Sequence, residues 1–189
     1  MEADGMKDTN KPGPAFSIRR LLMQALQELV TTVLPAVFIA LFVNVFVAQA
    51  TTIDGPSMQP NLCCHQWVIV EKTTYWFLHG PRRGDVVTFD LPGEEIALIK
   101  RVVALAGETV EVRDGQVLID GQLLEEHWTT QLGGPDYAPA LVPPLHVFVL
   151  GDNRPNSRDS RYFGPVPVDQ VIGRAWFVCW PPDQLRSIR

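Results

Sequence analysis

Thr109-Val110-Glu111-Val112-Arg113-Asp114-Gly115-Gln116-Val117-Leu118-Ile119 holds the clearest structural signal in this chain, because two short apolar segments flank a two-residue turn. In the first segment apolar and polar residues alternate, which is the pattern of a strand with one buried face. Asp-Gly is a preferred pair in the tight turns of β-hairpins, where both positions take a positive φ. Asp120-Gly121 repeats the signal directly afterwards. The stretch predicts antiparallel hairpins.

Short apolar segments separated by glycine and proline continue on both sides of this stretch. Further candidate strands are Trp67–Val70, Asp85–Phe89, Ile96–Ala104, Val147–Leu150 and Val171–Trp180. No segment after Ile53 has a helical stripe of ten or more residues. We therefore expect a mainly β protein with an antiparallel, barrel-like domain, on which residues 122–145 form a long loop or a small insertion. Four large aromatic residues are expected in its core, unless some form an exposed patch that dips into a membrane interface: Trp67, Trp76, Phe77 and Trp128.

An apolar run without any charged residue, Val30–Ala50, precedes the β segments. About 20 such residues cross the hydrocarbon core of a bilayer as a helix. A cleaved secretory signal is the alternative, since Ala48-Gln49-Ala50 has the small-x-small pattern of a cleavage site. The run is longer than a usual signal core, which favours a retained single transmembrane helix. The expected division is an N-terminal tail over 1–28, a membrane span over 29–53 and an extramembrane domain over 54–189.

The charges that flank the span predict its orientation. Arg19 and Arg20 precede it, whereas Asp54 follows it and the next basic residue is Lys72. By the positive-inside rule the N-terminus is cytoplasmic and the domain lies on the other side of the membrane. A modest amphipathic stripe over 16–29 is expected to extend the helix into the interface.

Overall composition excludes several function classes. The net charge of −5 provides no basic surface for nucleic acid. The three cysteines, Cys63, Cys64 and Cys179, do not make a disulfide framework, and no Cys-x-x-Cys or His-x-x-x-His spacing indicates zinc. We therefore expect no metal and no other cofactor. The sequence gives neither the disulfide state of the cysteines nor the oligomeric state.

Two residues carry candidate chemistry. Ser57 follows the predicted span after one turn-like segment, Asp54-Gly55-Pro56, and Lys100 ends the apolar run Ile96–Ile99. Burial favours the neutral form of a lysine, and a neutral amine can deprotonate a serine hydroxyl. A serine at the membrane surface and a buried lysine suggest a protease that cuts at the bilayer. A third segment, Gly151–Val166, mixes carboxylates, amides and three arginines, which suggests a loop that charge pairs hold against the active site.

Four motifs in order resemble those of the bacterial-type type I signal peptidases, the Ser/Lys proteases that remove signal peptides from exported proteins. The motifs span residues 55–166 and are Gly55-Pro56-Ser57-Met58-Gln59-Pro60-Asn61-Leu62, Arg83-Gly84-Asp85-Val86-Val87-Thr88-Phe89, Ile99-Lys100-Arg101-Val102-Val103-Ala104-Leu105-Ala106-Gly107-Glu108, and Gly151–Gly164. Ser-Met-x-Pro alone is a weak signal, but all four motifs in order are highly specific.

The resemblance implies a role for each matching residue. Ser57 corresponds to the nucleophile, Lys100 to the general base and Ser157 to the serine whose hydroxyl orients the lysine amine. Asp159 with Arg161 corresponds to a structural ion pair, Asp152 with Arg101 to a second polar contact, and Met58 to a residue beside the substrate pocket. Some relatives carry a serine donor to the oxyanion at the position of Gly55. Here the oxyanion hole rests on backbone N–H groups, chiefly that of Ser57.

The resemblance also implies substrates and a location. The expected substrates are preproteins that bear signal peptides and are cut after small residues in an Ala-x-Ala pattern. The enzyme is expected to contact membrane lipid. The expected location is the plasma membrane, and a thylakoid membrane has the same chemistry and orientation. Three alternatives differ in class: a Ser-His-Asp protease, a Ser/Lys self-cleaving protein, and a non-enzymatic anchored β module. The first needs one of four histidines that nothing pairs with Ser57: His65, His79, His127 and His146.

Overall fold

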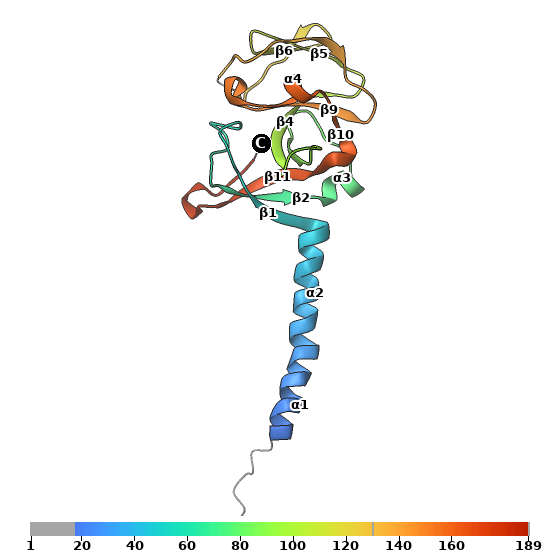
Figure 1. The fold of residues 1–189 in the computed structure, drawn as a ribbon, viewed down its shortest axis with the longest axis vertical. Coiled ribbons are helices and arrows are strands. Elements are labelled where there is room, and N and C mark those ends of the chain that lie inside the picture. Colours follow the sequence, from blue (N-terminus) through green and yellow to red (C-terminus); the bar gives the residue numbers. More distant parts are fainter. Residues whose placement is uncertain (1–17, 130, 189) are drawn as a thin grey trace, which may run out of the picture. The chain divides into compact units, whose positions relative to one another are not determined.

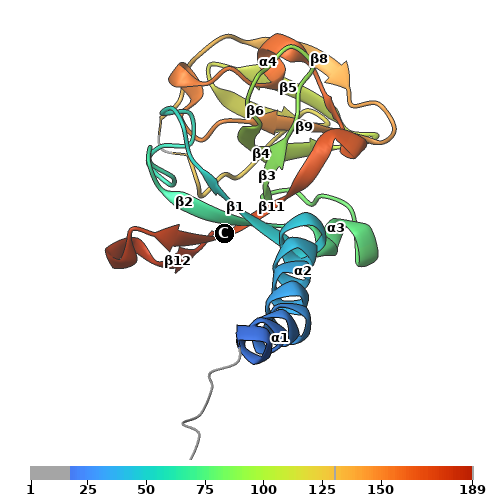
Figure 2. The ribbon, with the colours of Figure 1, turned by 60° about the horizontal axis from the view of Figure 1, so that its bottom comes forward.

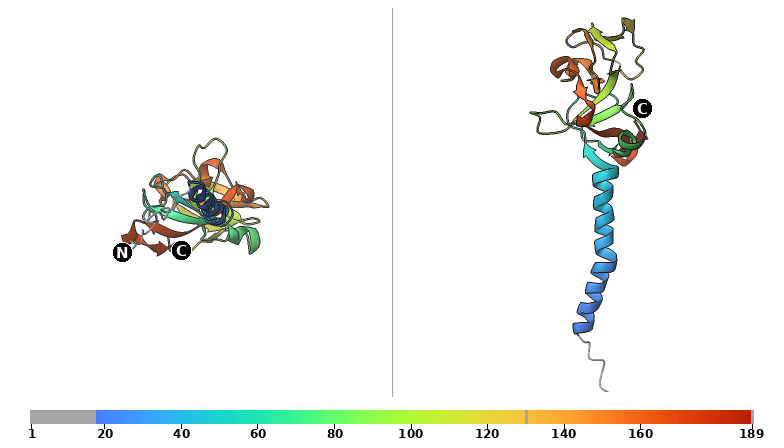
Figure 3. Two further views of the ribbon diagram at one scale, coloured as in Figure 1. Left: turned by 90° about the horizontal axis from the view of Figure 1, so that it is seen from below. Right: turned by 90° about the vertical axis from the view of Figure 1, so that its right-hand side faces the viewer.

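A computed structural model describes residues 18–129 and 131–188, and the chain divides into two compact units, residues 1–42 and 43–189. One helical segment runs over Ile18–Val47 and is long and apolar enough to cross a membrane. It comprises α1 (Ile18–Glu28), a π-helical turn (Leu29–Val33), α2 (Leu34–Phe42) and a second π-helical turn (Val43–Val47). Figure 3 shows α1 continuing into α2 without a break. Its side chains are exposed from Ile18 to Phe46, as expected for a helix whose apolar surface faces lipid.

The helix begins and ends earlier than the predicted span over 29–53. Residues 18–28 of the predicted tail are helical, and residues 1–17 lie outside the described residues. Ala48–Thr52 form strand β1, which pairs with β2 (Trp67–Glu71). The Lys72 amide donates to the carbonyl of Val47, and its ammonium donates to those of Asn44 and Val45. These donors satisfy carbonyls that a helix end leaves unpaired, and so favour ending the helix there.

The second unit is a mainly β domain with a curled antiparallel half-barrel sheet, which confirms the predicted fold class (Figures 1 and 2). The strand order is β1-β2-β11-β3-β4-β9-β10, and β12 pairs with β11. The bounds are β3 Val86–Phe89, β4 Leu98–Leu105, β9 His146–Leu150, β10 Val166–Pro167, β11 Val171–Trp180 and β12 Arg186–Ser187. Short helices α3 (Thr73–Phe77) and α4 (Ser160–Phe163) lie in the connections, with single 3-10 turns over Arg154–Asn156, Val168–Gln170 and Pro182–Gln184.

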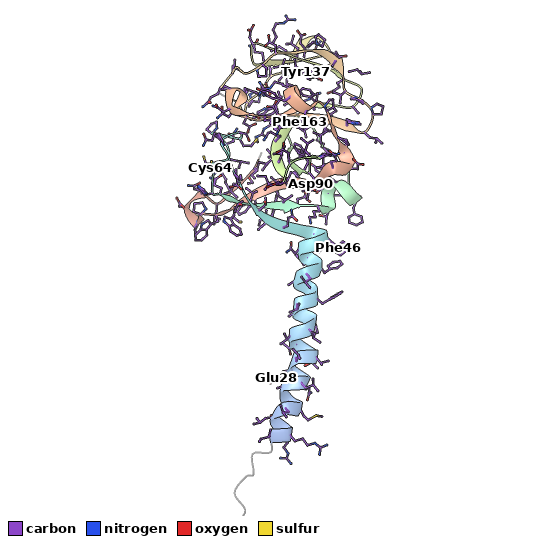
Figure 4. The ribbon with its side chains drawn as sticks, in the orientation of Figure 1. Glu28, Phe46, Cys64, Asp90, Tyr137 and Phe163 are labelled. Carbon is purple, nitrogen blue, oxygen red and sulfur yellow. The ribbon has the colours of Figure 1, made fainter. Side chains whose placement is uncertain are left out.

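A four-stranded second sheet covers one end of this domain. Its order is β7-β6-β5-β8, and its strands are β5 Thr109–Arg113, β6 Gln116–Ile119, β7 Gln122–Leu123 and β8 Tyr137–Leu141. Both predicted hairpin turns are present, since Asp114-Gly115 and Asp120-Gly121 have positive φ. The side chains of the two sheets pack together, with the ring of Tyr137, labelled in Figure 4, 4.8 Å from that of Phe148 on β9.

Three apolar clusters fill the domain. One joins β4 and β9 to the second sheet, a second lies between β3, β9 and α4, and a third joins β2 and β11 to the segment after β1. The third cluster contains Ile53, Met58, Leu62, Val86 and Ile99 and borders the candidate site. It keeps water away from the site and thereby lowers its local dielectric.

Two of the four aromatic residues expected in the core are exposed, so that expectation was wrong for them. Trp67 is 46% exposed and Phe77 is 78% exposed. Trp128 is half-buried and lies under the guanidinium of Arg101, 5.1 Å from its ring centroid. The side chain of Trp76 lies outside the described residues. Trp67 faces Trp180 in the β2–β11 register, and both are about half exposed. An exposed tryptophan pair is typical of a surface that meets a partner or a membrane.

Candidate active site

Ser57 lies in a turn that begins directly after β1. Gly55 has φ +87°, a conformation that glycine takes readily and that turns the chain out of the strand. Asn153 holds the next two residues from the other side. Its amide donates to the Ser57 carbonyl at 3.0 Å, and its side-chain nitrogen donates to the Pro56 carbonyl at 3.2 Å. The position of the serine is therefore fixed by the segment 151–164.

Lys100 reaches Ser57 from the middle of the large sheet. Its side chain leaves β4, is 4% exposed, and places Nζ 2.9 Å from Ser57 Oγ and 2.8 Å from the Ile99 carbonyl. Burial lowers the pKa of Lys100 from 10.5 to about 8, against the opposing pull of the Asp159 and Asp152 carboxylates. A substantial fraction of the amine is therefore neutral near pH 8 and can accept the serine proton.

The two residues border a cavity of about 240 Å³. Its lining comes from the end of β1, the Ser57 turn, β3 and the start of β4: Thr51, Thr52, Asp54, Ser57, Thr88, Ile96, Ala97, Leu98, Ile99 and Lys100. Leu98–Lys100 pair with β3 on one side, whereas the pairing of β4 with β9 begins only at Arg101. Among the described residues, the start of β4 therefore has a free strand edge beside Ser57, as an extended peptide requires.

The backbone amide of Ser57 donates no hydrogen bond to any residue within 18–129 or 131–188. An N–H that is attached to the nucleophile and otherwise unengaged is suited to bind the oxyanion of a tetrahedral intermediate. Gly55 supplies no side-chain donor. A Cβ built on it would meet no atom within 4 Å, but its positive φ makes any side chain there strained.

Ser157 lies close to the pair without a hydrogen bond to the lysine. Its side chain is buried, and its Oγ has no hydrogen-bond partner among the described residues. Gly151 separates it from the nucleophile: a Cβ on Gly151 would lie 2.2 Å from Ser157 Oγ and 2.5 Å from the Ser57 carbonyl oxygen. The structure thus brings Ser157 to the site, and the bond to Lys100 stays a prediction.

Two buried ion pairs stand beside the site. Arg101 donates two hydrogen bonds of 2.8 Å to Asp152, and both side chains are 1% exposed. Arg161 donates to both carboxylate oxygens of Asp159 at 2.8 and 2.9 Å. The Asp159 carboxylate also accepts the Gly151 amide at 3.1 Å. Ion pairs with two hydrogen bonds each hold the side chains in a fixed geometry, and removing one partner destabilises the fold because it leaves a buried charge unpaired.

Sequence reasoning missed a second set of contacts, which connects Glu126, Thr129 and Gly133 to the segment 151–164. Arg154 is 1% exposed and donates to Glu126 and to the Gly115 carbonyl. Arg161 donates to the Gly133 carbonyl, and Thr129 Oγ1 donates to the Asp152 carbonyl at 2.7 Å. Arg154 stands in the fourth motif and was visible there. Nothing in the local sequence indicates that Glu126 or Thr129 contacts the segment 151–164.

Met58 is fully buried in the apolar cluster with Ile53 and Ile99. It follows the nucleophile in the chain and packs behind it, whereas Ile99 lines the cavity itself. Methionine adapts its shape to irregular gaps, which suits a residue that supports the Ser57 turn from below.

Comparisons with known proteins identify a family and several relatives of this chain. The model of the family "Signal peptidase, peptidase S26" matches residues 26–180. The chain is 42% identical to a signal peptidase I of Leptolyngbya laminosa, over 99% of this chain and 96% of that protein. It is 41% identical to probable signal peptidase I-1 of Synechocystis sp., over 85% of this chain and 86% of that protein.

A plant protein is among the relatives. The chain is 34% identical to thylakoidal processing peptidase 1 of Arabidopsis thaliana, over 79% of this chain and 47% of that protein. The family match covers most of the chain, and the Leptolyngbya relative aligns along nearly all of it. The chain therefore belongs to the signal peptidase family, peptidase S26, and is a serine peptidase of the signal peptidase I type.

Proposed function

We propose that this signal peptidase is a membrane-anchored endopeptidase that uses Ser57 as nucleophile and neutral Lys100 as general base. The observation that carries the proposal is the 2.9 Å contact between Lys100 Nζ and Ser57 Oγ in a buried site. No histidine makes a described contact with Ser57, so a Ser-His-Asp arrangement has no geometric support within 18–129 and 131–188.

The reaction has two halves. Ser57 Oγ attacks the scissile carbonyl carbon while Lys100 Nζ takes the hydroxyl proton, and the Ser57 amide binds the oxyanion. The C–N bond then breaks, and Lys100 returns its proton to the leaving amine. In the second half Lys100 deprotonates a water molecule that attacks the acyl-enzyme ester, and the proton goes back to Ser57 Oγ as the ester bond breaks. Ser157 Oγ, next to Gly151, orients the lysine amine during these transfers.

The cavity and the strand edge beside it offer a binding place for the substrate. An extended peptide that pairs with the free edge of Leu98–Lys100 points its first and third residues before the cut to the same face. Both side chains then face the cavity of about 240 Å³ that Ser57 and Lys100 border. This volume admits small side chains but does not by itself exclude larger ones, so the proposed Ala-x-Ala pattern rests on membership of the signal peptidase family.

The anchor and the exposed aromatic pair favour a lipid surface as the place of work. In this proposal the helix over Ile18–Val47 spans the membrane with the N-terminus in the cytoplasm, and residues 54–189 form the peptidase domain on the opposite side. The signal peptide's own apolar core is membrane-embedded, so its cut site emerges just outside the bilayer, and Ser57 follows the helix by only ten residues in the sequence. Trp67 and Trp180 contact the interface there. The plasma membrane is the proposed location, and the thylakoid membrane is the alternative.

Cleavage of a purified preprotein with an Ala-x-Ala site tests the proposal, with the full-length chain in detergent beside Ser57→Ala and Lys100→Met. We expect the wild type to cut at that site, and both variants to lose at least about a thousandfold in rate, as expected for loss of the nucleophile or its base. Arg113→Met is the control for replacing a cation by methionine. Its side chain is 63% exposed on β5, outside the cavity, so this variant should cut like the wild type.

Three outcomes would contradict the assignment. If Lys100→Met retained activity, another group would have to be the base. If folded wild type left several preproteins intact, the chain would be an anchored β module that binds a partner. Self-cleavage at a fixed site of its own chain, without cleavage of added preproteins, would indicate the self-processing alternative.

A further inference from the structure

A buried hydroxyl without a partner lies in the wall of the catalytic cavity. Thr88, on β3, is 2% exposed and lines the same cavity as Ser57 and Lys100. Its Oγ1 is closed off from solvent and has no hydrogen-bond partner among the described residues. Leaving a buried hydroxyl unsatisfied costs folding free energy, so such a group in a native structure calls for an explanation.

Packing does not explain the threonine. Along β3, Val87 and Phe89 face one apolar cluster, while Val86 on the opposite face joins another. Strand alternation puts Thr88 on the face of Val86, and its register partner is Ile99, a residue that lines the cavity. Valine has the same shape and would fit this apolar face without an orphan oxygen. The position therefore carries a hydroxyl at a cost to stability.

The substrate is the group that can reach this oxygen. A change of rotamer about the Thr88 Cα–Cβ bond moves the hydroxyl by about 120° around that bond, and a rotamer that turns the oxygen to the cavity directs it at whatever fills the cavity. The cavity admits small side chains, and among small side chains serine and threonine carry the complementary donor and acceptor.

We propose that Thr88 is a specificity-determining residue, whose hydroxyl hydrogen-bonds a serine or threonine side chain at the first or third substrate position before the cut. The inference rests on the proposed function, since it assigns part of that cavity to substrate. A cavity of this size lined only by aliphatic groups would treat alanine and serine much alike, whereas a site that makes a hydrogen bond discriminates against the analogue that lacks it. The enzyme thus accepts Ala-x-Ala sites and favours a hydroxylated residue at one of the two positions.

Matched peptides test this without changing side-chain size. Two series carry alanine, serine or 2-aminobutyrate at the first or the third position before the cut, because 2-aminobutyrate replaces the serine hydroxyl with a methyl. The full-length enzyme cuts them in detergent, beside Thr88→Val, Thr88→Ser and the control Thr109→Val. Thr109 lies on β5, outside the cavity, so its variant should behave like the wild type.

For the wild type we expect kcat/KM for serine to exceed that for 2-aminobutyrate about fivefold at one of the positions, as for one additional hydrogen bond. The ratio should fall to about one in Thr88→Val and persist in Thr88→Ser. Thr88→Val should melt at the same temperature as the wild type or higher, because it removes the unpaired oxygen.

The outcomes distinguish a failure of the role proposed for Thr88 from a failure of the peptidase assignment. A ratio of one at both positions in the wild type, or a ratio that survives in Thr88→Val, would overturn the role of Thr88 while leaving the peptidase assignment intact. If the wild type cut none of these peptides and no preprotein either, the proposed function itself would fail. A serine preference that disappears equally in Thr109→Val would also exclude Thr88, since the effect would then not be local to the cavity.

Discussion

Folding disfavours the charged form of Lys100. Its pKa in the folded chain is about 8, below its ordinary value of 10.5, because burial penalises the charged ammonium. The nearby carboxylates of Asp152 and Asp159 would restore the charge, but Arg101 and Arg161 engage both of them. The arginines thus hold the two negative charges in their own ion pairs, and burial decides the protonation state of the base.

Activity should follow this ionisation. The neutral amine is the active form, so kcat/KM rises as the pH increases through about 8 and reaches its plateau near pH 9. Below pH 8 it should fall about tenfold per pH unit, since the neutral fraction does so. The measurement is kcat/KM for one preprotein between about pH 6 and pH 10. A profile that stayed flat over the acidic half of that range would show that Lys100 is not the base.

Removing the lysine should raise stability in a defined pH window. Below pH 8 the lysine is charged in both the folded and the unfolded chain, so the folded state bears the full cost of burying it. Above pH 10.5 it is neutral in both, and the cost is absent. Lys100→Met should therefore be more stable than the wild type by up to about 3 kcal/mol at neutral pH, given a pKa difference of about 2.5.

Thermal melting of both proteins at neutral pH and at pH 10.5 measures this difference. The advantage of Lys100→Met should shrink between the two pH values, because the wild type gains stability over the range in which its lysine has lost the proton in the folded chain but still carries it in the unfolded chain. An equal difference at both pH values would mean that methionine packing, and not the buried charge, explains it.

The loop after β9 packs closely against the backbone of Ser57. Gly151 directly follows β9 and lies between Ser157 on one side and the Ser57 carbonyl on the other, with no room for a Cβ. Gly151→Ala should push the loop away from the nucleophile by a few tenths of an ångström or more. Because catalysis is sensitive to misplacement on this scale, we expect kcat to fall about a hundredfold. Gly80→Ala is the matched control, since a Cβ there meets nothing within 4 Å.

The comparison needs both kcat and melting temperature. A folded Gly151→Ala with reduced kcat would show that the loop positions the nucleophile. Activity equal to that of Gly80→Ala would contradict the tight approach of the loop to Ser57.

Elements with a strong local pattern were predictable, and those that depend on a distant partner were not. The strand over Val171–Trp180 was predicted with its observed bounds because apolar residues fill it apart from Gly173 and Arg174. Ala48–Thr52 continues the apolar helix in sequence and becomes β1 only because β2 pairs with it. β8, Tyr137–Leu141, contains Pro139 and lies in a segment rich in glycine and proline, which predicted a loop.

The same distinction applies to the candidate site. Ser57 and Lys100 stand in motifs with a recognisable chemistry, 43 positions apart, and the sequence predicted their pairing as nucleophile and base. The orphan oxygen of Thr88 and the Glu126–Arg154 pair follow from side-chain packing, which no local pattern encodes. The hydrogen bond between Ser157 and Lys100 stays a prediction, since it depends on the rotamers of two buried side chains.

At the scale of the whole molecule, the chain joins a helix that is long and apolar enough to cross a membrane to a peptidase domain with exposed tryptophans. Trp67 and Trp180 are opposite each other on β2 and β11, so both side chains lie on one face of the sheet. Tryptophan favours the boundary between lipid and water because its ring is apolar and its N–H is polar. This pair is expected to hold the domain near the bilayer from which the substrate emerges.

Replacing both residues tests this coupling. Trp67→Ser with Trp180→Ser should raise KM about fivefold for a preprotein embedded in vesicles, because the domain spends less time at the surface. For a water-soluble peptide the same variant should keep kcat/KM within about twofold, since neither residue lines the cavity. Leu123→Ser is the control, an exposed apolar residue on β7 of the second sheet, at the other end of the domain from β2 (Figure 1). Equal losses on both substrates would indicate a structural role for the pair, and no loss on vesicles would exclude contact with lipid.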